Sequence, residues 1–106
     1  MTRVKFAGYT CYVEHGTYQN GRKAIRLIDA EDSIPVATAT VNVPEVDFSC
    51  YLDGDVSDVT AIKNYGGNEG MLKVLMEAGV VQPLQAHVPT GYVKVPLVRV
   101  IESFGE

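Results

Sequence analysis

Two alternating segments on either side of Asn20-Gly21 constrain the fold more than any other feature of the chain. Residues 9–14 alternate in character with a period of two, which is typical of a strand with one buried face. Asn-Gly tolerates positive φ at both positions, so it suits the tight turn between two antiparallel strands. Residues 24–29 continue as the partner strand. The sequence therefore predicts a β-hairpin.

A third strand is predicted at residues 36–43, after a turn-forming cluster at residues 30–33. Small apolar side chains occupy one face of this segment, and threonines occupy most of the other. That pattern is typical of a half-buried strand, and Pro44 ends it because proline cannot donate a ladder hydrogen bond. Three successive antiparallel strands predict an N-terminal meander.

One amphipathic helix is predicted at residues 68–78. Asn68 is a suitable N-cap, and Glu69 complements the positive end of the helix dipole. Apolar side chains recur at helical spacing, and Gly79 suits the left-handed residue that ends many helices. Because a helix of about ten residues is marginal alone, we expect it to pack on the sheet.

Three further segments complete the expected secondary structure. Residues 59–65 and 92–101 predict strands, and residues 48–52 predict a short strand in the least regular part of the chain. The last strand is apolar on both sides and contains Pro96, which indicates an edge position or a bulge. An exposed edge at Pro96 leaves room for a homodimer.

Together these segments predict an α+β fold: an antiparallel sheet of four to six strands, beginning with the N-terminal meander, with one amphipathic helix packed on it. The length of 106 residues fits one domain, 1–106. No signal peptide is recognisable and no run approaches roughly 20 apolar residues, so we expect a cytoplasmic protein without a membrane span. Cys11 and Cys50 are expected to stay reduced.

Charge is unevenly distributed along the chain, around a net charge of −4. This net charge argues against direct nucleic-acid binding, because phosphates attract basic surfaces. No Lys or Arg lies between Arg26 and Lys63, which predicts a negative field over part of the surface, although turns favour Asp in any case. The eight acids of this interval are Asp29, Glu31, Asp32, Glu45, Asp47, Asp53, Asp55 and Asp58.

Side-chain spacing predicts no metal or cofactor site. Residues 53–58 resemble the opening of a calcium loop but lack the glycine of its sixth position, so an acidic turn is favoured. Cys11 and His15 lie too far apart along a strand to share one zinc ion. Residues 66–70 precede a helix, which suits an anion, but no lysine follows the glycines and Glu69 repels phosphate.

Three stretches, read in order, resemble a family of small domains of unknown function from bacterial genomes, phages and plasmids. The stretches are Ala37-Thr38-Ala39-Thr40-Val41-Asn42-Val43-Pro44, Ile62-Lys63-Asn64-Tyr65-Gly66-Gly67-Asn68-Glu69-Gly70-Met71-Leu72 running to Glu77-Ala78-Gly79-Val80-Val81, and Val88-Pro89-Thr90-Gly91-Tyr92-Val93 running to Pro96. The chain departs from the family pattern at Gly66-Gly67, where a polar or acidic pair is expected. The resemblance implies a bacterial or phage cytoplasm and a small accessory role, and it implies no reaction.

The leading functional hypothesis is a non-enzymatic accessory binding protein that acts through a protein partner, as a host-takeover or anti-defence factor does. The residues predicted to bind are Asp53, Asp55, Asp58, Tyr65 and Asn68, and no catalytic residue or metal ligand is assigned. One alternative is a small-molecule or nucleotide-binding module that uses residues 66–70. A second alternative is a thiol-dependent enzyme that uses Cys11 or Cys50.

Overall fold

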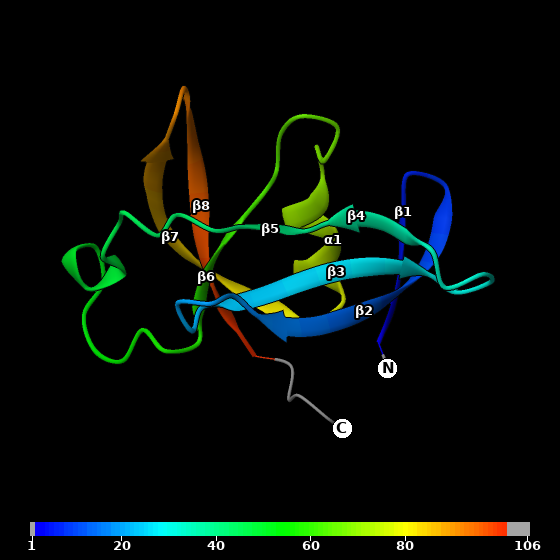
Figure 1. Cartoon of the computed structure of the whole chain (residues 1–106), viewed down its shortest axis with the longest axis horizontal. Coiled ribbons are helices and arrows are strands. Elements are labelled where there is room, and N and C mark those ends of the chain that lie inside the picture. The colour runs from blue at the N-terminus through cyan, green and yellow to red at the C-terminus, as the bar shows by residue number, and fades with distance from the viewer. Residues whose placement is uncertain (1, 102–106) are drawn as a thin grey trace.

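The computed structural model describes residues 2–101 of the chain and shows an α+β fold (Figure 1). These residues form two antiparallel sheets of four strands each, one α-helix and one short 3-10 helix. The sequence predicted one sheet of four to six strands. The first sheet alone has four strands, and the second four-stranded sheet was not predicted. One helix packed against antiparallel strands is confirmed.

The first sheet is the predicted meander with one extra strand at its edge. Its order is β1-β2-β3-β4, and every neighbouring pair is antiparallel. The second sheet has the order β5-β6-β8-β7. The strands are β1 (Arg3–Phe6), β2 (Tyr9–Thr17), β3 (Lys23–Asp29), β4 (Pro35–Thr38), β5 (Thr40–Val41), β6 (Val59–Ile62), β7 (Val81–Thr90) and β8 (Val93–Val100).

The predicted hairpin at Asn20-Gly21 is confirmed, with a different turn. Thr17 pairs with Lys23, and the Gly21 N–H donates to the Tyr18 carbonyl at 2.9 Å. Of the two central residues only Gly21 has positive φ, at 87°. The turn is therefore a type I turn closed by a left-handed glycine, which adds one residue to the tight two-residue loop.

The segment predicted as one strand at 36–43 is divided between the two sheets at Ala39. The Ala39 N–H donates to the Ile25 carbonyl of β3 at 2.8 Å, and its own carbonyl accepts from the Lys63 N–H at 2.8 Å. One residue thus bonds to the first sheet on one side and to the end of β6 on the other. Its methyl side chain is fully buried, which allows the two sheets to approach at this point.

The second sheet is the middle layer of the molecule. All four residues of β6 are buried, and β8 alternates between two hydrophobic clusters. The first cluster lies between the two sheets and the helix, and contains Val4, Phe6, Cys11, Val13, Ile25, Leu27, Ala39, Ile62, Met71, Leu75, Val80, Val81 and Val98. The second lies on the opposite face of the second sheet, and contains Val43, Phe48, Val59, Ala61, Val88, Val95 and Leu97.

The cover of the second cluster comes from residues 43–58, whose one regular element is the 3-10 helix η1 (Phe48–Cys50). The short strand predicted at 48–52 is therefore wrong. The Asp47 carboxylate accepts the Ser49 N–H at 2.9 Å, a local bond that favours a helical turn over an extended chain. The Arg22 guanidinium lies 3.6 Å from the centre of the Phe48 ring and donates to the Val43 carbonyl, which fastens this cover to the β2–β3 hairpin.

The helix α1 (Met71–Glu77) begins later than predicted, because Asn68 is not its N-cap. The buried Asn68 side chain instead donates from Nδ2 to the Thr38 carbonyl at 2.7 Å and ties the loop to β4. The N-cap position is Gly70, with φ of 90°. The Leu72 N–H donates to Asn64 Oδ1 at 3.0 Å, so a residue at the end of β6 caps the helix.

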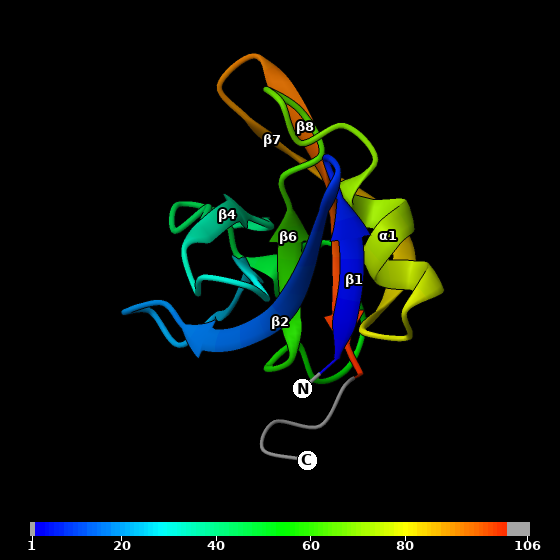
Figure 2. The same ribbon diagram turned by 90° about the vertical axis from the view of Figure 1, so that its right-hand side faces the viewer.

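The end of the helix is as predicted. Gly79 has φ of 75°, its N–H donates to the Met76 carbonyl at 3.1 Å, and the Val80 N–H donates to the Leu75 carbonyl at 3.0 Å. This pair of bonds is a Schellman motif, which satisfies the last helical carbonyls. In Figure 2, α1 packs against β1 on the side away from β2, and α1 also contacts β7. The helix thereby covers the first cluster at the edge strands of both sheets.

The strands β1 and β7 were not predicted, and each has a feature that explains the omission. β1 has only four residues, and β7 contains Pro83 and Pro89 and is interrupted by a bulge between Pro83 and His87. Pro96 of β8 pairs with His87 at the end of that bulge, beyond the last β8 residue that pairs with β6. Pro96 thus lies where β8 has a neighbour on one side alone, in agreement with the prediction of an edge position or a bulge.

We expect Gly79→Ala to lower the free energy of unfolding by about 1 kcal/mol, because an L-side chain disfavours the left-handed φ. A Cβ at this position meets no atom within 4 Å, so the loss is conformational and not steric. Urea unfolding followed by circular dichroism measures it. Gly16→Ala is the matched control, because Gly16 lacks positive φ and its Cβ meets Ala24 Cβ at an ordinary 4.0 Å. Equal losses in both variants would contradict the Schellman assignment.

Candidate functional site

The β7–β8 hairpin projects from the body of the molecule in both ribbon views (Figures 1 and 2). β6 pairs with β8 through Ala61 and Leu97 and no further, whereas β7 and β8 stay paired as far as Thr90 and Val93. The outer half of the hairpin, which we call the arm (residues 87–96), therefore has no neighbouring strand on the side of β6. The chain leaves this side after β6 because Asn64 turns away to cap the helix.

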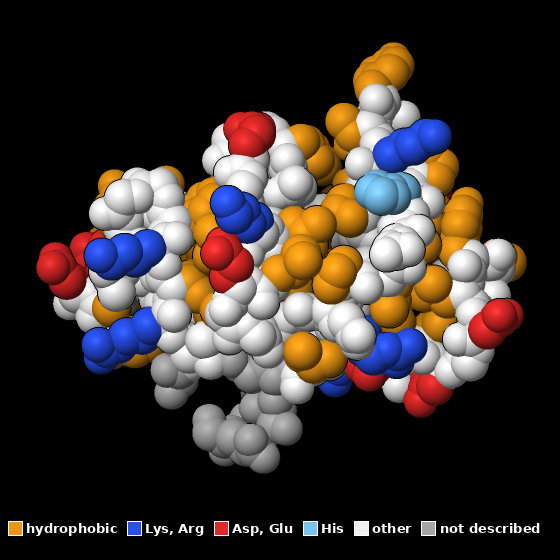
Figure 3. Space-filling model, turned by 180° about the vertical axis from the view of Figure 1, so that it is seen from behind, with side chains coloured by type: hydrophobic (Ala, Val, Ile, Leu, Met, Phe, Trp, Pro, Cys, Tyr) orange, Lys and Arg blue, Asp and Glu red, His pale blue; other side chains and the backbone are white. Residues whose placement is uncertain are grey.

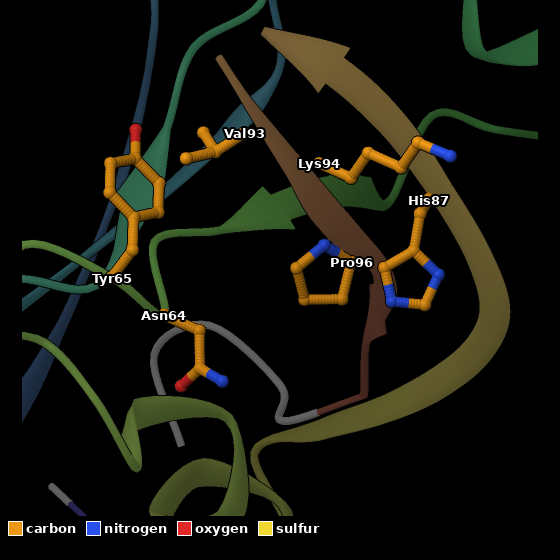
Figure 4. Close-up of a pocket in the computed structure, with 6 residues that line it drawn as sticks. All are labelled: Asn64, Tyr65, His87, Val93, Lys94 and Pro96. Atoms are coloured by element: carbon orange, nitrogen blue, oxygen red, sulfur yellow. The ribbon is translucent and has the colours of Figure 1, made fainter.

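A hollow of about 340 Å³ lies where β6 ends and the arm runs on (Figure 4). We call this hollow the notch. It forms because the sheet loses one strand at this point while β8 continues. Its lining residues are Asn64, Tyr65, His87, Val93, Lys94 and Pro96.

The arm supplies the basic side of the notch. His87 and Pro96 are register partners, and Lys94 follows Pro96 at a spacing of two on β8. Alternation along a strand places Lys94 and Pro96 on one face, with Val95 on the other. Val88 and Val95 are fully buried in the second cluster, so the arm is anchored by one face while His87 and Lys94 stay exposed on the other.

Asn64 and Tyr65 supply the opposite wall. Asn64 Oδ1 is held by the Leu72 N–H, which fixes the orientation of the amide, and Figure 4 shows its nitrogen directed toward the hollow. Tyr65 is half-buried against the second cluster, and Lys63 Nζ lies 5.8 Å from the centre of its ring. This wall thus presents the Asn64 amide nitrogen as a donor of fixed orientation, next to the Tyr65 ring and its contact with Lys63.

The arm is basic within an acidic protein. No Asp or Glu lies between Glu77 and Glu102. Arg99, at the far end of β8, pairs with Asp58, whereas Lys94 has no carboxylate partner among residues 2–101. Figure 3 shows a Lys or Arg side chain beside a His on the arm, without an Asp or Glu on the arm in that view. The notch therefore favours negatively charged or hydrogen-bond-accepting groups.

The tip of the arm exposes a tyrosine completely. Tyr92 has 107% of its reference accessible surface, the largest exposure of any large hydrophobic side chain in residues 2–101. Gly91 precedes it with φ of 57° and allows the two-residue connection between Thr90 and Val93. An aromatic ring in this position contributes nothing to the core, so its contact area is available to another molecule.

The five residues predicted to bind do not come together. Tyr65 lines the notch, and Asn68 is a buried structural residue that bonds to Thr38. Asp58 precedes β6 at the end opposite to the notch and pairs with Arg99. The Asp55 carboxylate accepts the Ser57 N–H at 2.9 Å, and this bond lowers the pKa of Asp55. Asp53 is exposed.

The acidic stretch does not form one face. Asp29, Glu31 and Asp32 lie in or beside the β3–β4 turn, at one end of the long axis of the molecule (Figure 1). The segment 43–58, which carries the other five acids, lies at the opposite end of this axis, along which the molecule extends 40 Å. The interval without basic residues is thus divided in space. Among residues 2–101, no three His, Cys, Asp or Glu side chains converge as metal ligands.

The glycine-rich turn before the helix already holds an anion of its own. The Glu69 carboxylate accepts the Gly67 N–H, with both oxygens at 3.2 Å. A phosphate at this N–H would have to displace Glu69 and overcome its charge. The turn is therefore built for internal hydrogen bonding, and it does not favour the nucleotide-binding alternative.

The two cysteines occupy contrasting environments. Cys11 is fully buried in the first cluster, and burial, together with the neighbouring Asp29, raises the pKa of its thiol. A raised pKa disfavours the thiolate that nucleophilic catalysis needs. Cys50 lies exposed in η1, outside both hydrophobic clusters.

Comparison with known proteins adds no relative: no family model, no curated protein and no solved structure matches the chain. The resemblance to a family of small bacterial and phage domains remains a prediction. In the part of the chain that the structure describes, neither helix is long enough to traverse a bilayer.

Thiol reactivity tests the two cysteine environments. At pH 8 we expect Cys50 alone to react with Ellman's reagent in the native protein, and Cys11 to react as well after unfolding in guanidinium chloride. Because the folded-state pKa of Cys11 is raised, its contribution to stability is present below the unfolded pKa, roughly 8.5, and is lost as the pH rises through the folded pKa. Rapid labelling of Cys11 in a Cys50→Ser variant would contradict its burial.

The role of Asn68 is tested by Asn68→Ala. We expect the free energy of unfolding to fall by about 1–2 kcal/mol, because the Thr38 carbonyl loses its donor and a buried amide is removed. Chemical denaturation measures the loss. Asn42→Ala is the matched control, because Asn42 makes its hydrogen bond at the surface, where its Oδ1 accepts from Asn20 Nδ2. We expect this variant to change the free energy of unfolding by less than about 0.5 kcal/mol.

Proposed function

We propose that the protein is a non-enzymatic accessory binding protein and that it contacts a protein partner through the β7–β8 arm. The observation that carries the proposal is the complete exposure of Tyr92 at the tip of a projecting, core-anchored hairpin. In the bacterial or phage setting that the family resemblance implies, the partner is a host protein.

The arm has the physical properties of a recognition element. Burial of Val88 and Val95 fixes its backbone, so binding costs little conformational entropy. Tyr92 offers a large apolar ring with a hydroxyl at low side-chain entropy, and tyrosine is among the residues enriched in binding hot spots. Pro89 adds a further exposed apolar side chain next to the turn. A rigid arm with an aromatic tip suits insertion into a concave surface of a partner.

Protein is a better-supported class of partner than nucleic acid. The chain carries a net charge of −4, and both ends of its long axis carry acidic segments. A nucleic acid would place many phosphates near these acids, and repulsion would oppose binding. A protein surface can match the aromatic tip and the small basic area of the arm without imposing a continuous run of negative charge.

Photo-cross-linking tests this function. We replace Tyr92 by p-benzoylphenylalanine and irradiate the variant in lysate of the bacterial host. The matched control carries the same group at Tyr51, an aromatic that is 47% exposed and lies outside the arm, at the end of η1. We expect a discrete cross-linked protein at position 92 and not at position 51.

The cross-linked protein is then purified and its affinity measured by calorimetry. We expect Tyr92→Ala to weaken binding at least tenfold, because an aromatic hot spot contributes about 2 kcal/mol or more, and Tyr51→Ala to leave affinity unchanged. Equal cross-linking at both positions, or equal affinity of both alanine variants, would disprove recognition by the arm.

A further inference from the structure

The notch beside the arm points to the chemistry of the partner. We propose that the notch binds a carboxylate side chain, Asp or Glu, that the protein partner presents next to the surface contacted by Tyr92. This inference rests on the proposed function for the identity of the partner as a protein. The preference of the notch for carboxylate rests on its lining alone.

The donors of the notch come from two separate parts of the chain. Lys94 and His87 come from the arm, and Asn64 comes from the segment that follows β6. Lys carries donors without acceptors, imidazole carries at least one N–H in either protonation state, and the Asn64 nitrogen is directed into the hollow (Figure 4). A carboxylate offers oxygen acceptors to Lys94 and His87, which lie on the same side of the notch (Figure 4).

Among residues 2–101, no acceptor is recorded for the Lys94, His87 and Asn64 donors. Asn64 Oδ1 is used by the Leu72 N–H, which leaves the amide nitrogen for a ligand, and no acid lines the notch. Between Glu77 and Glu102 the sequence has no Asp or Glu that could fold back onto Lys94. The acids of residues 2–101 thus all lie outside the lining of this hollow.

The dimensions favour a side chain over a polyanion. The hollow measures about 340 Å³, and its apolar lining residues are Tyr65, Val93 and Pro96. The methylenes of Glu can pack there while the charged end meets Lys94. Nucleic acid would require a track of basic residues, whereas the basic residues that line the notch are Lys94 and His87.

Nuclear magnetic resonance with a matched peptide pair tests the notch directly. The probes are a blocked octapeptide of alternating Glu and Ser and its counterpart with Gln in place of Glu. We expect the Glu peptide to shift the backbone amides of Asn64, His87 and Lys94, with an affinity at least fivefold higher than that of the Gln peptide. Equal shifts with both peptides, or shifts confined to other residues, would overturn the proposal.

Two further variants locate the effect. Lys94→Met keeps the aliphatic stem and removes the charge, and it should lower the affinity for the Glu peptide about fivefold. Lys5→Met on β1 is the control, because Lys5 lines a separate surface hollow beside α1, and it should leave the affinity unchanged. A single-stranded oligothymidylate that shifts the same amides more strongly than the Glu peptide would assign the notch to nucleic acid and overturn the carboxylate proposal.

Failure of this inference can be told from failure of the proposed function. If the partner found by cross-linking at position 92 binds wild-type protein and Lys94→Met equally, the arm is the binding element and the notch does not hold a carboxylate. If the Glu peptide binds the notch but nothing cross-links at position 92, the notch has the proposed chemistry and the arm does not carry the proposed function.

Discussion

Burial of the second sheet on both faces is the constraint on which the rest of the structure depends. β6 and β8 pack against the first sheet and α1 on one side, and against residues 43–58 on the other. Each fully buried aliphatic side chain contributes roughly 1.5–3 kcal/mol, so covering both faces supplies two cores to a chain of 106 residues. The irregular segment 43–58 is therefore required as a cover, and the arm can extend because Val88 and Val95 anchor it to the second core.

Local pattern predicted the elements whose stability is local. The hairpin at Asn20-Gly21 and the helix end at Gly79 follow from turn and cap chemistry within a few residues, and both are confirmed. The division of one strand at Ala39 depends on hydrogen bonds to Ile25 and Lys63, which are distant in sequence. The alternation of residues 36–43 therefore does not predict it. Asn68 was wrongly predicted as the N-cap, because its side-chain amide bonds to the Thr38 carbonyl, which is distant in sequence, and does not cap the helix.

The candidate site was less predictable than the fold. The eight acids between Arg26 and Lys63 form one interval of the sequence, and the structure divides this interval between two ends of the molecule. Of the predicted residues, Tyr65 alone lines the notch, since the notch exists only where β6 stops and β8 continues. One signal was present in the sequence and was missed: the absence of acids from Glu77 to Glu102, which is the counterpart of the absence of bases from Arg26 to Lys63.

The two prolines and the bulge of β7 have a consequence for how this molecule can evolve. The prolines lack backbone N–H donors, and the bulge makes this edge strand irregular. Both features oppose the addition of another chain to the sheet by backbone hydrogen bonding. The recognition proposed for the arm then relies on side chains such as Tyr92 and Lys94, which lie outside both cores. Substitutions of these side chains can therefore change the contact surface of the arm while both cores keep their packing.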